Sequence, residues 1–197
     1  MEQATTLRRR DVVARFLADR GDLLVVSGLG SPTYDCAAAG DHPLNFYLWG
    51  AMGSAITVGL GLALAQPFRR VLVVTGDGEM LMGLGAIATV AARKPVNLAV
   101  AVIDNERYGE TGMQATHTAE GVDLAAIARA AGFAVAATVV DDSGLPQAAM
   151  ILRGAPGPAM IVVKVTAARD PLVLPPRDGT YLKQRFRQAL LGADAVA

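Results

Sequence analysis

The sequence contains one cysteine, Cys36, among 197 residues. A single cysteine cannot form a disulfide within the chain, and it excludes a cysteine-rich zinc or iron–sulfur site built from this chain. Free thiols are usual in reducing compartments. We therefore expect a cytoplasmic protein.

The sequence also has no excess of either charge. Lys and Arg together number 18, and so do Asp and Glu. No overall field attracts nucleic acid or anionic lipid, so an anionic ligand must be bound by local groups. We expect neither a nucleic-acid nor a membrane partner, and we interpret the run Arg8-Arg9-Arg10 as a solvated helix face.

No apolar run is long enough to cross a bilayer. Residues 1–16 include basic residues without the apolar stretch of a signal peptide, and "LLVVSGLG" is short and broken by glycine. We expect a soluble, untargeted chain. The apolar share is 52%, and the length suits one well-filled core, so we expect a single domain over residues 1–197.

What the sequence does contain is an alternation of two kinds of segment. Aliphatic runs typical of strands buried on both faces occupy residues 23–27, 71–75, 96–104, 134–140 and 159–165. Segments with helical patterning occupy residues 6–19, 53–66, 80–93, 122–131 and 143–153. This alternation indicates right-handed crossovers and an α/β fold, a doubly wound and mainly parallel sheet with helices on both faces.

Residues 170–197 are predicted to form an extended tail and a short C-terminal helix. The segment "DPLVLPPRDG" carries three prolines, which are poorly tolerated inside a sheet. The amphipathic segment "TYLKQRFRQALLG" that follows can form a helix ending at Gly192.

Three glycine-rich loops follow predicted strands. They are "SGLGSPT" after the first strand, "TGDGEM" after the second and "DNERYGETGMQ" after the third. In sheets of this kind ligands bind beyond the carboxyl ends of the strands. We therefore expect the three loops to lie close together and to form the site.

The loop "TGDGEM" has the chemistry of a metal-bridged phosphate site. Gly76 and Gly78 allow a sharp turn and a close approach of a ligand to a helix N-terminus. Asp77 and Glu79 would repel a bare phosphate, and a divalent cation between carboxylate and anion removes the conflict. Neither a Walker loop nor a G-x-G-x-x-G motif fits. A tight loop with Asp77 as a plain helix cap is the alternative.

One predicted helix and one predicted strand lie between Asp77 and Asn105. One crossover returns the chain to the same edge of the sheet, so Asn105 can reach the same ion. A carboxylate, an amide oxygen, a backbone carbonyl and diphosphate oxygens together form the octahedral oxygen shell that Mg²⁺ prefers.

The stretch "GDGEMLMGLGAIATVAARKPVNLAVAVIDNERYG" resembles the thiamine diphosphate motif, which begins with Gly-Asp-Gly and closes with an asparagine. The resemblance implies thiamine diphosphate and Mg²⁺ as cofactors. It implies Asp77, Asn105 and the main-chain carbonyl of Arg107 as metal ligands. It also implies that the backbone N–H groups of Gly78 and Glu79 bind the diphosphate.

Two further segments are similar to cofactor-binding segments of this family. In "YLWGAMGSAITVGLGLALA", Met52 matches the bulky residue that supports a bent cofactor, and Gly50 would face the pyrimidine. In the first loop, Gly30 and Ser31 lie where relatives make further contacts to the diphosphate. Plain core packing of Met52 and an ordinary Gly-Pro turn are the alternatives.

The family resemblance also implies a partner. In these enzymes the cofactor spans two kinds of domain, and a glutamate from a pyrimidine-binding domain activates it. The resemblance covers roughly residues 6–190 and includes only the diphosphate-binding domain. We expect a hetero-oligomer in which a separate alpha subunit supplies that glutamate. A cofactor-binding subunit that regulates a partner without completing a catalytic site is the rival hypothesis.

The chain as a whole resembles the sulfopyruvate and phosphonopyruvate decarboxylase family, matching the beta chain of the former and the corresponding C-terminal domain of the latter. The residues that carry the resemblance are "PLNFYLWGAMGSAITVGLGLALA", "DNERYGETGMQ" and "RDGTYLKQRFRQAL". The resemblance implies a carboxy-lyase that converts a 2-oxo acid to an aldehyde and CO2. The cysteine content argues against ferredoxin-linked oxidoreductases. A decarboxylase or carboligase for a less acidic 2-oxo acid is the alternative.

The loop "YGETGMQATHT" would cover the reactive side of the cofactor. Thr111, Gln114 and His117 can donate hydrogen bonds to a substrate anion, and we name them as catalytic candidates. Glu110 would oppose a doubly anionic substrate if it faces inward. Tyr108 is a candidate cofactor contact that can also pack beneath the loop, and His117 can be a loop residue without a role.

Overall fold

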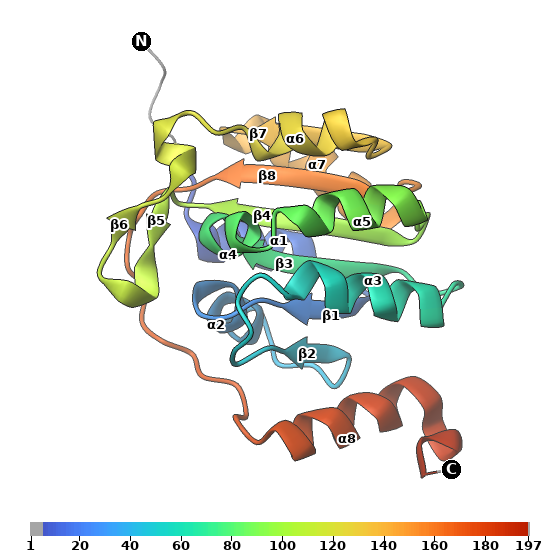
Figure 1. The fold of residues 1–197 in the computed structure, drawn as a ribbon. Coiled ribbons are helices and arrows are strands. Elements are labelled where there is room, and N and C mark those ends of the chain that lie inside the picture. Colours follow the sequence, from blue (N-terminus) through green and yellow to red (C-terminus); the bar gives the residue numbers. More distant parts are fainter. Residues whose placement is uncertain (1–5, 197) are drawn as a thin grey trace.

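The computed structural model describes residues 6–196, so residues 1–5 and 197 of the predicted domain lie outside it. A six-stranded parallel sheet has the order β2-β1-β3-β4-β8-β7 (Figure 1). Its strands are β1 (Leu24–Ser27), β2 (Asn45–Tyr47), β3 (Val71–Gly76), β4 (Leu98–Asp104), β7 (Val135–Val139) and β8 (Ala159–Lys164). A hairpin of β5 (Arg107–Tyr108) and β6 (Gln114–Ala115) extends beyond the carboxyl end of β4.

The five predicted aliphatic runs all form strands of the sheet. The side chains of β1 and β4 are buried along their whole length, because helices cover both faces. Strand β2, at one edge of the sheet, was not among the predicted strands. It is three residues long, which is too short for a periodic pattern to show.

The helices are α1 (Arg9–Leu17), α2 (Ser31–Ala38), α3 (Ala55–Ala65), α4 (Asp77–Met82), α5 (Gly85–Arg93), α6 (Leu124–Ala131), α7 (Leu145–Gly154) and α8 (Gly179–Leu191). Short 3₁₀ turns are η1 (Gly109–Thr111), η2 (His117–Glu120), η3 (Asp142–Gly144) and η4 (Gly192–Val196). Helix α2 was not predicted, because Gly-Ser-Pro is typical of a turn as well as of a helix start.

The prediction of one helix over residues 80–93 is wrong. Helices α4 and α5 separate near Gly83. A Cβ atom on Gly83 would lie 2.1 Å from the carbonyl oxygen of Gly53, so the loop before α3 packs directly on the backbone there.

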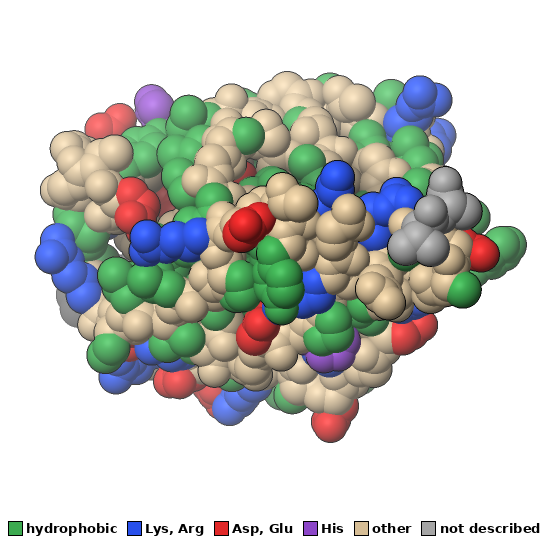
Figure 2. All heavy atoms as spheres, turned by 90° about the horizontal axis from the view of Figure 1, so that it is seen from below, with side chains coloured by type: hydrophobic (Ala, Val, Ile, Leu, Met, Phe, Trp, Pro, Cys, Tyr) green, Lys and Arg blue, Asp and Glu red, His purple; other side chains and the backbone are tan. Residues whose placement is uncertain are grey.

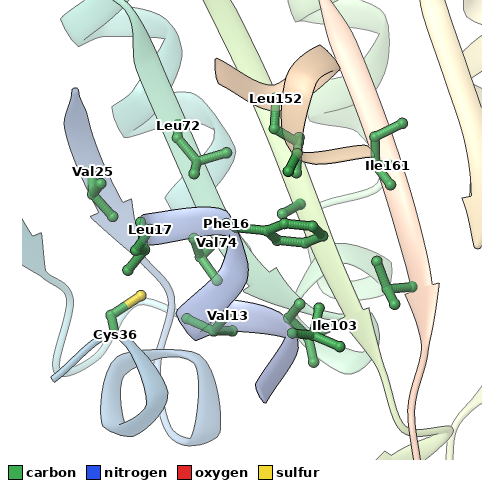
Figure 3. Close-up of a cluster of buried hydrophobic side chains, with 14 of the residues drawn as sticks. Val13, Phe16, Leu17, Val25, Cys36, Leu72, Val74, Ile103, Leu152 and Ile161 are labelled. Carbon is green, nitrogen blue, oxygen red and sulfur yellow. The ribbon is translucent and has the colours of Figure 1, made fainter. Parts of the chain in front are cut away.

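Two hydrophobic clusters lie on opposite faces of the sheet. Helices α1, α2 and α7 cover one face, and Figure 3 shows Val13, Phe16 and Leu17 of α1 next to the strands. Helices α3, α5 and α6 cover the other face, which is nearer the viewer in Figure 1. Helices on both faces of a parallel sheet confirm the predicted doubly wound α/β fold.

The direction of the chain across the sheet changes between β1 and β3. From β1 the chain passes through α2 to β2, and from β3 it passes through α4 and α5 to β4 on the other side. Gly76 of β3 pairs with Ile103 of β4, so Asp77 and Asn105 follow neighbouring strand ends. A crevice at such a switch point is the usual ligand site of this fold.

An extended segment and then α8 follow β8. Residues 170–178 contain no strand, and α8 ends before Gly192. Helix α8 packs beside β2, where the rings of Phe46 and Phe186 meet edge to face with centroids 5.5 Å apart (Figure 1). The tail therefore carries the chain from the end of β8 to the opposite edge of the sheet.

The interpretation of Arg8-Arg9-Arg10 as a solvated face is wrong. Arg9 is only 6% exposed, and its guanidinium lies 2.5 Å from the buried carboxylate of Asp35 in α2. Arg8 and Arg9 also pair with Asp170 at the start of the tail. The run neutralises carboxylates that α1, α2 and the tail bury between them, and those partners are distant in the sequence.

No helix within residues 6–196 is both long and apolar enough to cross a membrane. On the face seen in Figure 2, basic and acidic side chains are interspersed.

Two glycines of α3 give a matched test of how this helix packs. A Cβ on Gly59 would lie 2.2 Å from Cγ2 of Val73, whereas nothing lies within 4 Å of a Cβ on Gly61. We expect Gly59→Ala to lower the free energy of unfolding by about 1–3 kcal/mol through overpacking. Gly61→Ala should raise it by up to about 1 kcal/mol. Urea unfolding measures both, and equal effects would contradict this packing.

Candidate functional site

The site is built on the first turn of α4. Strand β3 ends at Gly76 and α4 begins at Asp77, so the free N–H groups of this turn face the carboxyl edge of the sheet. A cavity at this edge is lined by residues from the loops after β1, β3 and β4. The three loops that were predicted to meet therefore do so.

The carboxylate of Asp77 is buried, with 1% of the residue exposed. Its Oδ2 accepts a hydrogen bond of 2.5 Å from the Thr116 hydroxyl and lies 3.4 Å from the Thr118 hydroxyl. Within residues 6–196 it forms no ion pair with a lysine or arginine. Burial, together with the negative charge of Asp104, raises the pKa of Asp77 to about 6.

Asn105 lies beside Asp77. Its backbone N–H lowers the pKa of the Asp77 carboxylate, and its side-chain oxygen accepts the N–H of Arg107 at 3.1 Å. Glu106 between them has a φ of 60°, the left-handed conformation that turns the chain back on itself. The structure thus brings together the carboxylate and the amide that were predicted as metal ligands, with the backbone of Arg107 next to them.

These groups fit a hard divalent cation. Carboxylate, amide and carbonyl oxygens are the ligands that Mg²⁺ prefers, and the buried charge of Asp77 has no cationic partner among the described residues. The described part of the chain has no cluster of three or more His, Cys, Asp or Glu side chains that could hold a metal. A cation bound here would therefore need oxygens from a bound anion as well.

A chain of buried polar groups continues from Asp77 into the protein. The Thr118 hydroxyl lies 2.9 Å from that of Thr116 and donates to Asp104 at 2.8 Å. Asp104 in turn pairs with Lys164 of β8 at 2.9 Å. The ends of β4 and β8 and the segment after β6 are thus connected to the carboxylate of Asp77. Sequence patterns did not identify Thr116, Thr118 or Lys164, because their partners are distant in the chain.

The ring of Tyr108 packs against the first turn of α4. A Cβ on Gly78 would lie 2.5 Å from Cε1 of Tyr108, so only glycine fits beneath the ring. Both residues also line the cavity. The ring of Tyr108 thus covers the start of α4, and its predicted contact with the cofactor stays a prediction.

The side chain of Glu79 is directed at two other loops. It is 4% exposed, and its Oε2 accepts a hydrogen bond of 2.9 Å from the Thr75 hydroxyl. Its Oε1 lies 3.4 Å from the N–H of Ala55 at the start of α3. Burial raises the pKa of Glu79, and these hydrogen bonds offset part of that effect. The predicted contact of its backbone with the diphosphate stays a prediction.

The predicted site residues that line the cavity are Ser31, Met52, Gly76, Asp77, Gly78, Glu79, Asn105, Arg107, Tyr108 and Thr111. Gly30, Gly50, Gln114 and His117 do not line it. Thr111 and Gln114 hydrogen-bond each other at 2.9 Å on the exposed hairpin, and His117 is exposed at the start of η2. The roles predicted for these residues stay predictions.

Charged residues of both signs also line the cavity. The guanidinium of Arg107 donates to the carbonyl oxygen of Glu106 at 3.0 Å, and Arg9 is already paired with Asp35. The carboxylate of Glu110 lies against the loop after β1, where a Cβ on Gly30 would be 2.8 Å from its Oε1. The cavity wall thus carries side chains of both charge signs.

Comparisons with known proteins agree with this geometry. The model of the family described as thiamine pyrophosphate enzyme, C-terminal TPP binding domain, matches residues 30–163. Sulfopyruvate decarboxylase subunit beta of Methanothermobacter thermautotrophicus is 37% identical over 187 residues, which are 95% of this chain and 97% of that one. Phosphonopyruvate decarboxylase of Streptomyces viridochromogenes is 40% identical over 84% of this chain but only 42% of its own length.

Solved structures share the fold. A thiamin diphosphate-dependent enzyme from Mycobacterium smegmatis matches 82% of this chain with a TM-score of 0.70 and 25% identity. Benzoylformate decarboxylase from Polynucleobacter necessarius matches 84% of it with a TM-score of 0.73 and 22% identity. This chain covers only 32% and 34% of those two chains. The chain belongs to the thiamine pyrophosphate enzymes and carries their C-terminal TPP-binding domain.

Proposed function

We propose that the chain is the diphosphate-binding subunit of a two-chain 2-oxo acid decarboxylase that depends on thiamine diphosphate and Mg²⁺. Its substrate would be sulfopyruvate or phosphonopyruvate, and its products the corresponding aldehyde and CO2. The observation that carries the proposal is that Asp77 lies beside Asn105 at the edge of the sheet where the direction of the chain changes. The chain also aligns almost end to end with a sulfopyruvate decarboxylase subunit.

In this proposal the chain's own residues bind and orient the cofactor. Asp77, the amide oxygen of Asn105 and the carbonyl of Arg107 would hold Mg²⁺. The N–H of Gly78 would donate to the diphosphate at the start of α4. Met52, which lines the cavity before α3, would support the bent cofactor. When bound, thiamine diphosphate supplies a nucleophilic carbon and an electron sink for decarboxylation.

A partner subunit is the second part of the proposal. This chain covers less than half of phosphonopyruvate decarboxylase and about a third of each solved structure. The relatives that this chain matches almost end to end are named subunit beta, which supports a pyrimidine-binding domain on another chain that would supply the activating glutamate. We also propose a cytoplasmic location, where the buried thiol of Cys36 would stay reduced.

Replacing Asp77 tests the metal site. Asp77→Asn keeps the size of the side chain and an acceptor for Thr116 but removes the charge. Loss of a residue that only supports a metal ligand typically weakens metal binding by about 10- to 100-fold. Because Asp77 is the proposed ligand itself, we expect a larger loss in the Mg²⁺-dependent binding of thiamine diphosphate by the reconstituted complex. Isothermal titration calorimetry at several Mg²⁺ concentrations measures this. Asp123→Asn, at the exposed N-cap of α6, is the control, and the complex with this variant should bind the cofactor normally. Normal activity of the complex with Asp77→Asn would refute the assignment of Asp77 as a metal ligand.

The isolated chain tests the need for a partner. We expect the purified chain to release no CO2 from a 2-oxo acid with cofactor and Mg²⁺ present, because it lacks the activating glutamate. Adding the product of a neighbouring reading frame with a pyrimidine-binding domain should restore turnover. Substantial turnover by the chain alone would contradict the two-chain proposal. A complex that binds cofactor but turns over no 2-oxo acid would favour a regulatory subunit instead.

Glu110 favours a second candidate function, a decarboxylase or carboligase for a less acidic 2-oxo acid. Its carboxylate in the cavity wall opposes a doubly anionic substrate, whereas Arg107 in the same wall attracts one.

A substrate panel separates the two candidates. We expect the reconstituted complex to have a higher kcat/KM for sulfopyruvate or phosphonopyruvate than for pyruvate. Glu110→Gln should widen that preference, because it removes a like charge from the wall. A lower kcat/KM for the doubly anionic substrates would support the second candidate.

A further inference from the structure

Glu79 is a buried carboxylate that the proposed chemistry does not use. It forms no ion pair with any described lysine or arginine. Burying a carboxylate is costly unless several hydrogen bonds satisfy its oxygens. Its partners therefore show what it contributes.

Four hydrogen-bond donors from three segments meet at this carboxylate. The hydroxyl of Thr75, at the end of β3, donates to Oε2, and the N–H of Ala55 approaches Oε1. The backbone N–H groups of Leu29 and Gly53 also face it and lower its pKa. One side chain thus connects β3, the loop after β1 and the loop before α3.

Close packing holds the carboxylate and both loops in this arrangement. A Cβ on Gly28 would lie 1.6 Å from Oε2 of Glu79, so the loop after β1 touches the carboxylate with its bare backbone. At the other end of α4, Gly83 meets Gly53 backbone to backbone. No side chain separates α4 from either loop at these points.

Both loops carry residues of the candidate site. The loop after β1 continues from Leu29 to Ser31, and the loop before α3 contains Met52 beside Gly53. Ser31 and Met52 line the cavity together with Asp77, which lies two residues before Glu79. One turn of α4 therefore carries the predicted metal ligand and also the group that holds the neighbouring loops.

We propose that Glu79 is a positioning residue whose carboxylate sets residues 28–31 and 52–55 relative to Asp77. Binding of a metal-bridged diphosphate then depends on this side chain through the loops that it holds. The effect on diphosphate rests on the proposed function, whereas the effect on the loops does not.

Hydrogen exchange on the full-length chain tests the positioning directly. Glu79→Gln replaces one acceptor oxygen with an amide NH2 group, which cannot accept a hydrogen bond from the donors that face it. The amides of Leu29, Gly53 and Ala55 should exchange about 10- to 100-fold faster, as expected on losing a hydrogen bond to a charged acceptor. Amides of α6 should keep their protection. The exposed Glu120→Gln serves as the matched control and should change none of them.

Binding of Mg²⁺ with inorganic diphosphate gives the second readout. Calorimetry should show about tenfold weaker binding to Glu79→Gln than to the wild-type chain. Unchanged exchange at the three amides overturns the proposal, and so does faster exchange with unchanged diphosphate affinity. If the wild-type chain binds no diphosphate, the proposed function fails, while the exchange data still decide the positioning of the loops.

Thr75→Val provides an independent test should Glu79→Gln fail to fold. It removes one donor to Oε2 and leaves the carboxylate in place. The same three amides should lose protection in the same direction by a smaller factor, and unchanged exchange would overturn the proposal.

Discussion

Two buried carboxylates on one turn of helix determine how the loops of this protein meet. Asp77 and Glu79 both lie in the first turn of α4, and each is surrounded by donors from other segments. A buried carboxylate must be hydrogen-bonded, so the segments that supply the donors are drawn to α4. The loops after β1 and β4 and the loop before α3 thereby become parts of one site.

Glycines make this close assembly sterically allowed. A Cβ on Gly78 would meet the ring of Tyr108, and a Cβ on Gly28 would meet the carboxylate of Glu79. Even an alanine at either position would push a loop away from α4. The Gly-Asp-Gly sequence therefore does more than turn the chain, because its second glycine admits the hairpin residue that covers the start of the helix.

The fold was predictable because its main signal is local. Uninterrupted aliphatic runs mark β3 and β4, and one crossover between them places Asp77 and Asn105 at adjacent strand ends. Other features depend on partners far along the chain. The roles of Thr116 and of Arg9 follow from carboxylates distant in sequence, so neither composition nor periodicity could indicate them.

The distribution of charge around the site follows from the same network. Lys164 pairs with Asp104 and with Glu106, both of which belong to the end of β4 and the turn after it. The hydroxyls of Thr116 and Thr118 separate that ion pair from Asp77. Lys164 is thus held by Asp104, and Asp77 keeps a buried negative charge beside Asn105. An internal salt bridge would have neutralised that charge, which the proposed Mg²⁺ site requires.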